Sequence, residues 1–115
     1  MGANTLRVVT LYPFEPEEVA RLQAGVPEGS VEIAVCADRD EFRRCLPDAD
    51  VVYGAIKAAE LPLATKLKWI QAGAAGLDNL DPAVLDFPLL TNYAGTFAPA
   101  IAETALGMLL CLTRG

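Results

Sequence analysis

The stretch Asp50-Val51-Val52-Tyr53-Gly54-Ala55, residues 50–55, decides the fold. Its run of apolar residues is typical of a strand buried on both faces, as in a parallel sheet covered by helices. Two β-rich segments precede it, at residues 6–12 and 31–36, and two follow it, at residues 68–72 and 89–92. Helical segments separate these strands, which predicts an α/β domain with a parallel five-stranded sheet. We expect the flavodoxin-like, doubly wound strand order 2-1-3-4-5.

The helices expected between these strands are marked by start and stop signals. They cover residues 16–24, 38–45, 61–67 and 82–85. Asp38 begins the second of them and Glu41 follows three residues later, which is the spacing of a capping box. A long apolar helix at about residues 97–113 closes the chain. Because no linker or repeat interrupts this alternation, residues 1–115 are predicted to form a single domain.

The last helix differs from an ordinary surface helix in its composition. Glu103 is its only charged residue, and large apolar residues cover its whole circumference. A helix that is apolar on every side is expected to be buried on every side, whereas an outer helix of a doubly wound domain shows one face to water. We therefore expect residues 97–113 to be covered by another domain or by a second copy of the chain. The polypeptide would then belong to a larger protein or to a homo-oligomer.

Composition narrows the possible partners and the compartment. With 115 residues, of which 53% are hydrophobic and 21% charged, the chain can bury a core and is not disordered. The net charge of −6 makes nucleic acids and anionic membranes poor partners. We expect neither a membrane-spanning helix nor a signal peptide. Cys36, Cys45 and Cys111 are expected to be free, inert thiols, and the sequence predicts a cytoplasmic protein.

Ligands of open parallel sheets bind beyond the carboxyl ends of the strands, which makes the loops there candidate sites. The loop after the fourth strand, residues 73–79, contains Gly73 and Gly76 separated by two alanines. These small residues would let a ligand approach the backbone, and successive amides could hold an anion. The alternative interpretation is a tight turn that happens to be rich in glycine. The loop carries no lysine or arginine, so a bound carboxylate would need a positive partner from elsewhere.

Other residues that could carry chemistry favour structural roles. Asp78 and Asp81 are expected to act as caps rather than to bind a cation. Lys57 is expected on the solvated surface, and Trp69 in the core. The chain contains no histidine, which excludes an imidazole base, a Ser-His pair or a His-ligated metal in this chain alone, and we predict no metal site. It has neither a G-x-G-x-x-G fingerprint nor a phosphate-binding loop.

Two longer motifs carry a family resemblance. Residues 67–81 read LKWIQAGAAGLDNLD, and residues 91–103 read TNYAGTFAPAIAE. They resemble the LKWIQ…GAGxDNID and TNxxGxxxxxxAE segments of the D-isomer-specific 2-hydroxyacid dehydrogenases, and the helix that follows is similar to that family's LALLLxLxR stretch. The resemblance implies the N-terminal part of the substrate-binding domain of an oxidoreductase. Such enzymes transfer a hydride between NAD or NADP and a small 2-oxo or 2-hydroxy acid.

The resemblance also implies roles for individual residues. The backbone amides of Ala75 and Gly76 would hold the substrate carboxylate, and Ala75 would also lie near the nicotinamide of the cofactor. Gly54 and Ala55, at the end of the third strand, would border the substrate. Phe97 matches a position that lines the cleft, where it would make the pocket more apolar.

The same resemblance predicts what this chain lacks. The family's catalytic Arg, Glu and His and its G-x-G-x-x-G lie further along the chain, so residues 1–115 are expected to contain no catalytic residue of that reaction. We expect the chain to be inactive alone, to bind no cofactor tightly, and to need the missing nucleotide-binding domain. The alternative is a free-standing flavodoxin-like module that holds a small carboxylate at residues 73–76 and dimerises through its last helix.

Overall fold

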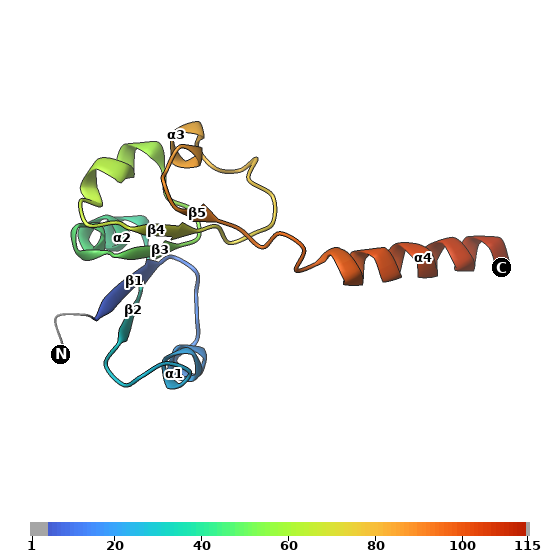
Figure 1. Cartoon of the computed structure of the whole chain (residues 1–115), viewed down its shortest axis with the longest axis horizontal. Helices are drawn as coiled ribbons and strands as arrows, with labels where there is room; N and C mark the ends of the chain where they lie inside the picture. The colour runs from blue at the N-terminus through green and yellow to red at the C-terminus, as the bar shows by residue number, and fades with distance from the viewer. Residues whose placement is uncertain (1–4, 115) are drawn as a thin grey trace.

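The computed structural model describes residues 5–114, and its centre is a five-stranded sheet whose strands all run parallel. The strands follow the order β2-β1-β3-β4-β5 (Figure 1), which confirms the predicted fold class and strand order. Their bounds are β1 (Leu6–Thr10), β2 (Val31–Val35), β3 (Val51–Tyr53), β4 (Trp69–Gln71) and β5 (Leu90–Thr91). In this register Val52 of β3 lies between Val9 of β1 and Ile70 of β4.

Helices connect successive strands. They are α1 (Pro16–Ala24), α2 (Arg39–Cys45), α3 (Pro82–Leu85) and α4 (Ala98–Arg114), with the 3₁₀ helices η1 (Leu46–Asp48) and η2 (Ala58–Leu63). The α-helix predicted at residues 61–67 is wrong, because η2 ends at Leu63. Pro62 lies inside η2 and has no amide hydrogen to donate to a continuing α-helix. The predicted cap of α2 is confirmed, since the Asp38 carboxylate accepts a hydrogen bond from the Glu41 amide at 2.8 Å.

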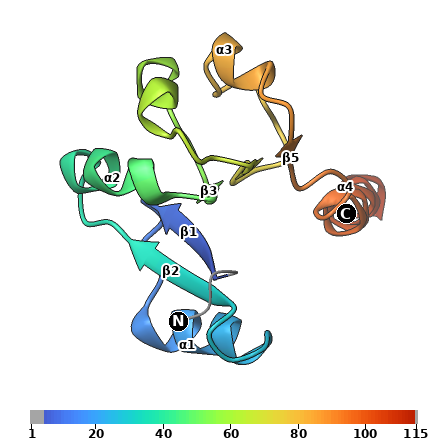
Figure 2. The same ribbon diagram turned by 60° about the vertical axis from the view of Figure 1, so that its left-hand side comes forward.

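The hydrophobic core lies on one face of the sheet. Val9, Val52 and Ile70 are fully buried at the centres of three neighbouring strands. Phe42 of α2 and Val84 of α3 belong to the same buried cluster. Right-handed crossovers explain this arrangement, because each connection after β2 moves the chain toward β5 and places its helix on the same side. In Figure 2, α2 and α3 lie together on that side.

The opposite face of the sheet is only partly covered. The connection from β1 to β2 runs in the other direction, so α1 lies across the sheet from α2 (Figure 2). It packs beside β2, where the Gln23 side chain donates to the Val31 carbonyl at 3.2 Å. Trp69 of β4 is consequently 38% exposed, and its prediction as a core residue is wrong. Its indole N–H donates instead to the Thr91 hydroxyl at 2.7 Å.

A buried carboxylate joins η2 to α2. Glu60 is 2% exposed, and its oxygens lie 3.0 Å from Nη1 of Arg39 and 3.3 Å from Nε of Arg43. The same carboxylate accepts a hydrogen bond from the Lys57 amide at 2.9 Å. A buried charge is tolerated where it is both paired and hydrogen-bonded, and Glu60 meets both conditions. This cluster holds the segment that follows β3 against α2.

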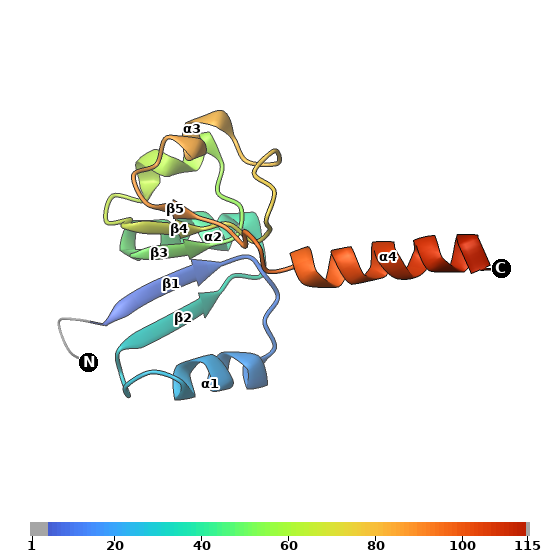
Figure 3. The same cartoon turned by 45° about the vertical axis from the view of Figure 1, so that its right-hand side comes forward.

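The last helix, α4, projects away from the rest of the molecule (Figure 3). The molecule measures 60 × 34 × 25 Å and has a radius of gyration of 17.7 Å. A compact domain of this length would have a radius of about 13 Å. Every residue of α4 is exposed, including Leu112 at 83%, so residues 5–114 do not themselves cover this apolar helix. Within the same residues, no helix combines the length and hydropathy needed to cross a membrane.

The Asp50 carboxylate links the beginnings of β1, β3 and β4. Its carboxylate accepts a hydrogen bond from the Arg7 amide at 2.9 Å and lies 2.9 Å from the Lys68 ammonium. The backbone hydrogen bond from Arg7, followed by the interaction with Lys68, lowers the pKa of Asp50 below its ordinary value of 3.8. The ionised carboxylate therefore stabilises the folded state.

We expect Asp50→Asn to lower the free energy of unfolding at neutral pH by about 1 kcal/mol, because a hydrogen bond to a charged acceptor is weakened. Folding lowers the pKa of Asp50, so its contribution is complete above pH 3.8 and is lost as the pH falls through the folded value. Urea unfolding should show a gap between wild type and variant that narrows from neutral pH to about pH 2. Asp48→Asn is the control, since its exposed pair with Lys66 spans 3.5 Å. A constant gap would contradict this account of Asp50.

Candidate functional site

The loops after β3 and β4 meet at the carboxyl edge of the sheet. The Gly54 amide donates to the Gln71 carbonyl at 2.9 Å. A Cβ atom added at Gly73 would lie 3.7 Å from the Cα atom of Gly54. Gly54 thus lies directly against residues 73–76, which we call the glycine loop.

The glycine loop is held through its carbonyl groups. The Asn92 side-chain amide donates to the Ala75 carbonyl at 2.7 Å, and the Tyr93 amide donates to the Ala74 carbonyl at 3.3 Å. Ala75 and Gly76 are both exposed. Within residues 5–114 their amide groups donate no hydrogen bond to the protein. Two neighbouring N–H groups at this edge therefore have no hydrogen-bond acceptor among the described residues.

The glycines of this loop provide space rather than an unusual backbone conformation. Positive φ values occur in the described chain at Gly29, Gly54 and Gly95, and not at Gly73 or Gly76. A Cβ atom at Gly76 would come within 2.8 Å of Oδ1 of Asp78, so that carboxylate would have to move. The space beside Gly76 is thus occupied by the Asp78 carboxylate.

Gly54 itself adopts a φ of 101°, a conformation that L-residues rarely adopt. We expect Gly54→Ala to lower the free energy of unfolding by about 1–2 kcal/mol, because the backbone would be strained. Gly107→Ala in α4 is the matched control, since the added methyl group meets no atom within 4 Å. Alanine favours a helix over glycine by up to about 1 kcal/mol, so this control should be neutral or stabilising. Similar urea midpoints for the two variants would contradict the prediction.

Ala55 lies at a neighbouring hollow of about 380 Å³ rather than on the glycine loop. Its carbonyl accepts a weak hydrogen bond from Arg39 at 3.4 Å, and the exposed Lys57 lines the same hollow. Asp81 also lies there, with its carboxylate accepting a hydrogen bond from the Ala58 amide at 2.8 Å. The prediction that the Asp81 side chain caps the following helix is wrong, because it makes this longer-range bond to the start of η2 instead.

A row of five ring side chains lies at the same edge of the sheet, and we call it the aromatic row. Tyr12, Phe14 and Tyr53 contact one another as a triangle, and the contacts continue from Tyr53 to Tyr93 and from Tyr93 to Phe97. Neighbouring ring centroids lie 4.5 to 6.4 Å apart in tilted or edge-on arrangements, which are favourable aromatic geometries. Phe97, predicted from the sequence to line the cleft, is 51% exposed at one end of the row.

The hydroxyl groups of Tyr53 and Tyr93 are hydrogen-bonded to each other at 2.8 Å. Burial, with the bond to Tyr93, raises the pKa of Tyr53 to about 12. This hydroxyl is therefore protonated at neutral pH and is poorly suited to act as a general base. Burial also raises the pKa of the Cys36 thiol to about 12, with Cys45 contributing, so Cys36 is a poor nucleophile. Cys111, by contrast, is exposed on α4.

The connection from β1 to α1 carries acidic side chains at the start of the helix. Dinucleotides place their pyrophosphate at a glycine-rich turn before a helix N-terminus. The connection between β1 and α1, residues 11–15, contains no glycine and leads to Glu15 at the N-cap, with Glu17 and Glu18 in the first helical turn. These acidic side chains would repel a pyrophosphate. Within residues 5–114 no group of three acidic or cysteine side chains is arranged to hold a metal ion.

The residues that hold the glycine loop in place were not predicted from the sequence. Asn92 and Tyr93 hold the glycine loop, and Tyr53 pairs with Tyr93 across the sheet. A signal was available, because these residues end or follow strands β3 and β5 and the carboxyl ends of parallel strands share one edge.

Comparisons with known proteins assign no family to the chain. A scan against protein-family models finds no match, and a search of curated proteins finds none either. The dehydrogenase resemblance of residues 67–81 and 91–103 therefore supports a proposal and no more.

Proposed function

We propose that this chain is the N-terminal part of the substrate-binding domain of an NAD- or NADP-dependent D-2-hydroxyacid dehydrogenase. The observation that carries the proposal is the pair of exposed, unbonded amides of Ala75 and Gly76. They lie at the carboxyl edge of the sheet, within the motif that resembles the family's carboxylate-binding loop. Gly54 borders the same loop, and Phe97 belongs to the aromatic row beside it.

In this proposal the chain binds and orients the substrate, while other parts of the protein supply the proton chemistry. The two amides hold the carboxylate of a small 2-oxo or 2-hydroxy acid, and Ala75 lies near the nicotinamide of a cofactor bound by a separate nucleotide-binding domain. The acid–base group and the arginine that polarises the substrate carbonyl also come from the nucleotide-binding domain. We expect the chain alone to show no turnover with NADH and 2-oxo acids. We propose that the protein works in the cytoplasm.

An amide-resolved NMR titration with pyruvate tests the binding role. The amide signals of Ala75 and Gly76 are expected to shift, with a dissociation constant in the millimolar range, or about −4 kcal/mol, because no cation is present in the loop. Methyl pyruvate is the control ligand, since it keeps the ketone and lacks the carboxylate. The absence of shifts at millimolar pyruvate, or equal shifts with the ester, would contradict carboxylate binding at this loop.

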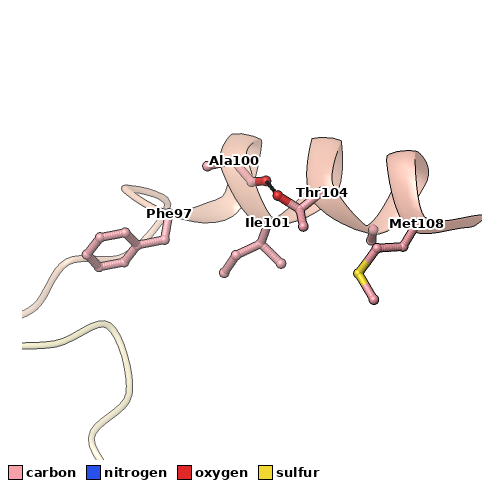
Figure 4. A pocket seen from close by; sticks show the side chains of 6 residues that line it. Phe97, Ala100, Ile101, Thr104 and Met108 are labelled. Atoms are coloured by element: carbon pink, nitrogen blue, oxygen red, sulfur yellow. Dashed lines mark hydrogen bonds between the residues drawn. The ribbon is translucent and has the colours of Figure 1, made fainter. Parts of the chain in front are cut away.

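The apolar helix α4 supports a second part of the proposal, that residues 97–113 pack against a second copy of the chain. Figure 4 shows the side chains that line a hollow of about 440 Å³ along this helix. Phe97, Ile101, Thr104 and Met108 recur there at helical spacing. An exposed apolar surface of this kind is typical of a protein–protein contact. The alternative function, a free-standing carboxylate-binding module, would use the same helix to dimerise.

Light scattering after size exclusion tests this contact. We expect the wild-type chain to run as an oligomer and a double variant, Ile101→Glu with Met108→Glu, to run as a monomer, because a contact would bury both new charges. Ala20→Glu adds a charge to the exposed surface of α1 and is expected to leave the oligomer intact. A wild-type chain that stays monomeric at every concentration would contradict the proposed contact.

A further inference from the structure

The aromatic row is assembled from three separate parts of the chain. Tyr12 and Phe14 follow β1, Tyr53 ends β3, and Tyr93 and Phe97 lie between β5 and α4. Residues so far apart in sequence form one continuous row because their strands end at the same edge of the sheet. Tyr12 and Phe97 are each 51% exposed. Phe97 also lines the hollow along α4 that the proposed oligomer contact would cover, so Tyr12 is the ring that stays open to a ligand.

Backbone contacts hold the aromatic row beside the glycine loop. The Tyr93 amide is bonded to Ala74, one residue before the first free amide of that loop. Tyr53 directly precedes Gly54, which lies against Gly73. A carboxylate held by the loop amides would therefore carry its side chain beside the rings.

The position of Tyr12 is fixed independently of its ring. The Thr10 hydroxyl donates to the Tyr53 carbonyl at 2.8 Å and accepts from the Tyr12 amide at 2.9 Å. Removal of the Tyr12 ring therefore leaves the bonds that hold this turn in place. The row can be shortened at this end without changing the backbone that supports it.

The chemical character of the row selects among side chains. The hydroxyls of Tyr53 and Tyr93 are bonded to each other, so these two residues present mainly ring carbon, while the half-exposed Tyr12 also carries a hydroxyl. It contains no lysine or arginine to pair with a second carboxylate. Flat aromatic groups gain from edge-on and offset contacts beyond the gain of burial alone.

We infer that the substrate of this site is a 2-oxo or 2-hydroxy acid with an aromatic side chain, of the phenylpyruvate class. The carboxylate binds the amides of Ala75 and Gly76, and the ring of the substrate packs against the aromatic row. A short side chain such as the methyl group of pyruvate leaves the row unused, and a dicarboxylic 2-oxo acid places a charge against it. This inference rests on the proposed function, because it needs the loop to hold the carboxylate.

A competition among three ligands tests the inference on the same 115-residue chain. Phenylpyruvate, pyruvate and 2-oxoglutarate are titrated while the amide signals of Ala75 and Gly76 are followed. We expect phenylpyruvate to bind about tenfold more tightly than pyruvate, as one set of aromatic contacts provides, and 2-oxoglutarate to bind no better than pyruvate. Equal affinities for phenylpyruvate and pyruvate would overturn the inference while leaving the proposed function standing.

Substitutions distinguish binding of phenylpyruvate at the aromatic row from its non-specific binding to the apolar helix α4. Tyr12→Ala should reduce the preference for phenylpyruvate and leave the affinity for pyruvate unchanged. Leu112→Ala removes a more exposed apolar side chain, at 83%, from the far end of α4 and should leave the preference intact. The dispersion of the amide signals verifies that each variant is folded. A preference that survives Tyr12→Ala would overturn the inference, and a failure of every acid to shift the two amides would overturn the proposed function together with it.

Discussion

Phe42→Ala is expected to lower the free energy of unfolding by about 4 kcal/mol, because it leaves a large cavity in the core. Phe42 is fully buried and belongs to the cluster that joins α2 to the centre of the sheet. Loss of the Phe42 ring would remove packing between α2 and the buried cluster that contains Val9 and Val52. These two residues belong to β1 and β3, the strands whose ends carry the site. For a small domain this is a large share of the total stability. Urea unfolding followed by circular dichroism measures the effect.

Phe42→Leu is the matched control, since it keeps most of the apolar volume and should cost about 1 kcal/mol. If the alanine variant is already unfolded without urea, the leucine variant supplies a measurable change in the same direction. Equal stabilities for the alanine and leucine variants would show that the Phe42 ring does not support the core as the structure indicates.

Glu60→Ala is expected to lower the free energy of unfolding by about 3 kcal/mol, because it leaves two arginines without their shared carboxylate. Glu60 is almost completely buried, while Arg39 and Arg43 keep 29% and 45% of their side chains exposed. Water can therefore reach the two arginine side chains left without a partner, so the loss of stability should lie at the lower end of the range for buried ion pairs. The substitution also removes the acceptor of the Lys57 amide and loosens the segment after β3.

Asp40→Asn provides the comparison for Glu60→Ala. Asp40 lies 3.4 Å from Arg43, but its side chain is 79% exposed. Exposed pairs of this kind contribute at most about 1 kcal/mol, so this variant should be almost as stable as wild type. Glu60→Gln should fall between the two, since the amide oxygen can still accept the Lys57 hydrogen bond. Similar urea midpoints for Glu60→Ala and Asp40→Asn would refute the role assigned to the buried cluster.

The fold was predictable because several local signals agreed. Apolar runs such as residues 50–55 marked buried strands, and the helical segments between them required parallel crossovers. The cap at Asp38 followed from spacing alone, since its partner Glu41 lies within the same turn. Local patterns of this type need no knowledge of distant parts of the chain.

The helix predicted at residues 61–67 failed for a local reason, Pro62, but the failed predictions for Trp69 and Asp81 depended on distant contacts. Trp69 was assigned to the core because aromatic residues in strands are usually buried, but only α1 covers that face of the sheet and it lies beside β2. Asp81 was assigned to a cap, and its carboxylate reaches Ala58 instead, 23 residues away in sequence. For the site, residues 73–76 were accessible to sequence reasoning. For the aromatic row, the strand order places its residues at one edge of the sheet, but the ring contacts themselves were not predictable because they depend on how three loops fold together.

The central claim is that this chain is one part of a D-2-hydroxyacid dehydrogenase, and the nucleotide sequence of its source gene beyond the Gly115 codon tests it most directly. We expect the reading frame to continue into a G-x-G-x-x-G dinucleotide fingerprint and then through an arginine, a glutamate and a histidine able to serve the reaction. A stop codon directly after Gly115 would contradict the claim, and the loop at Ala75 and Gly76 would then belong to a free-standing carboxylate-binding module.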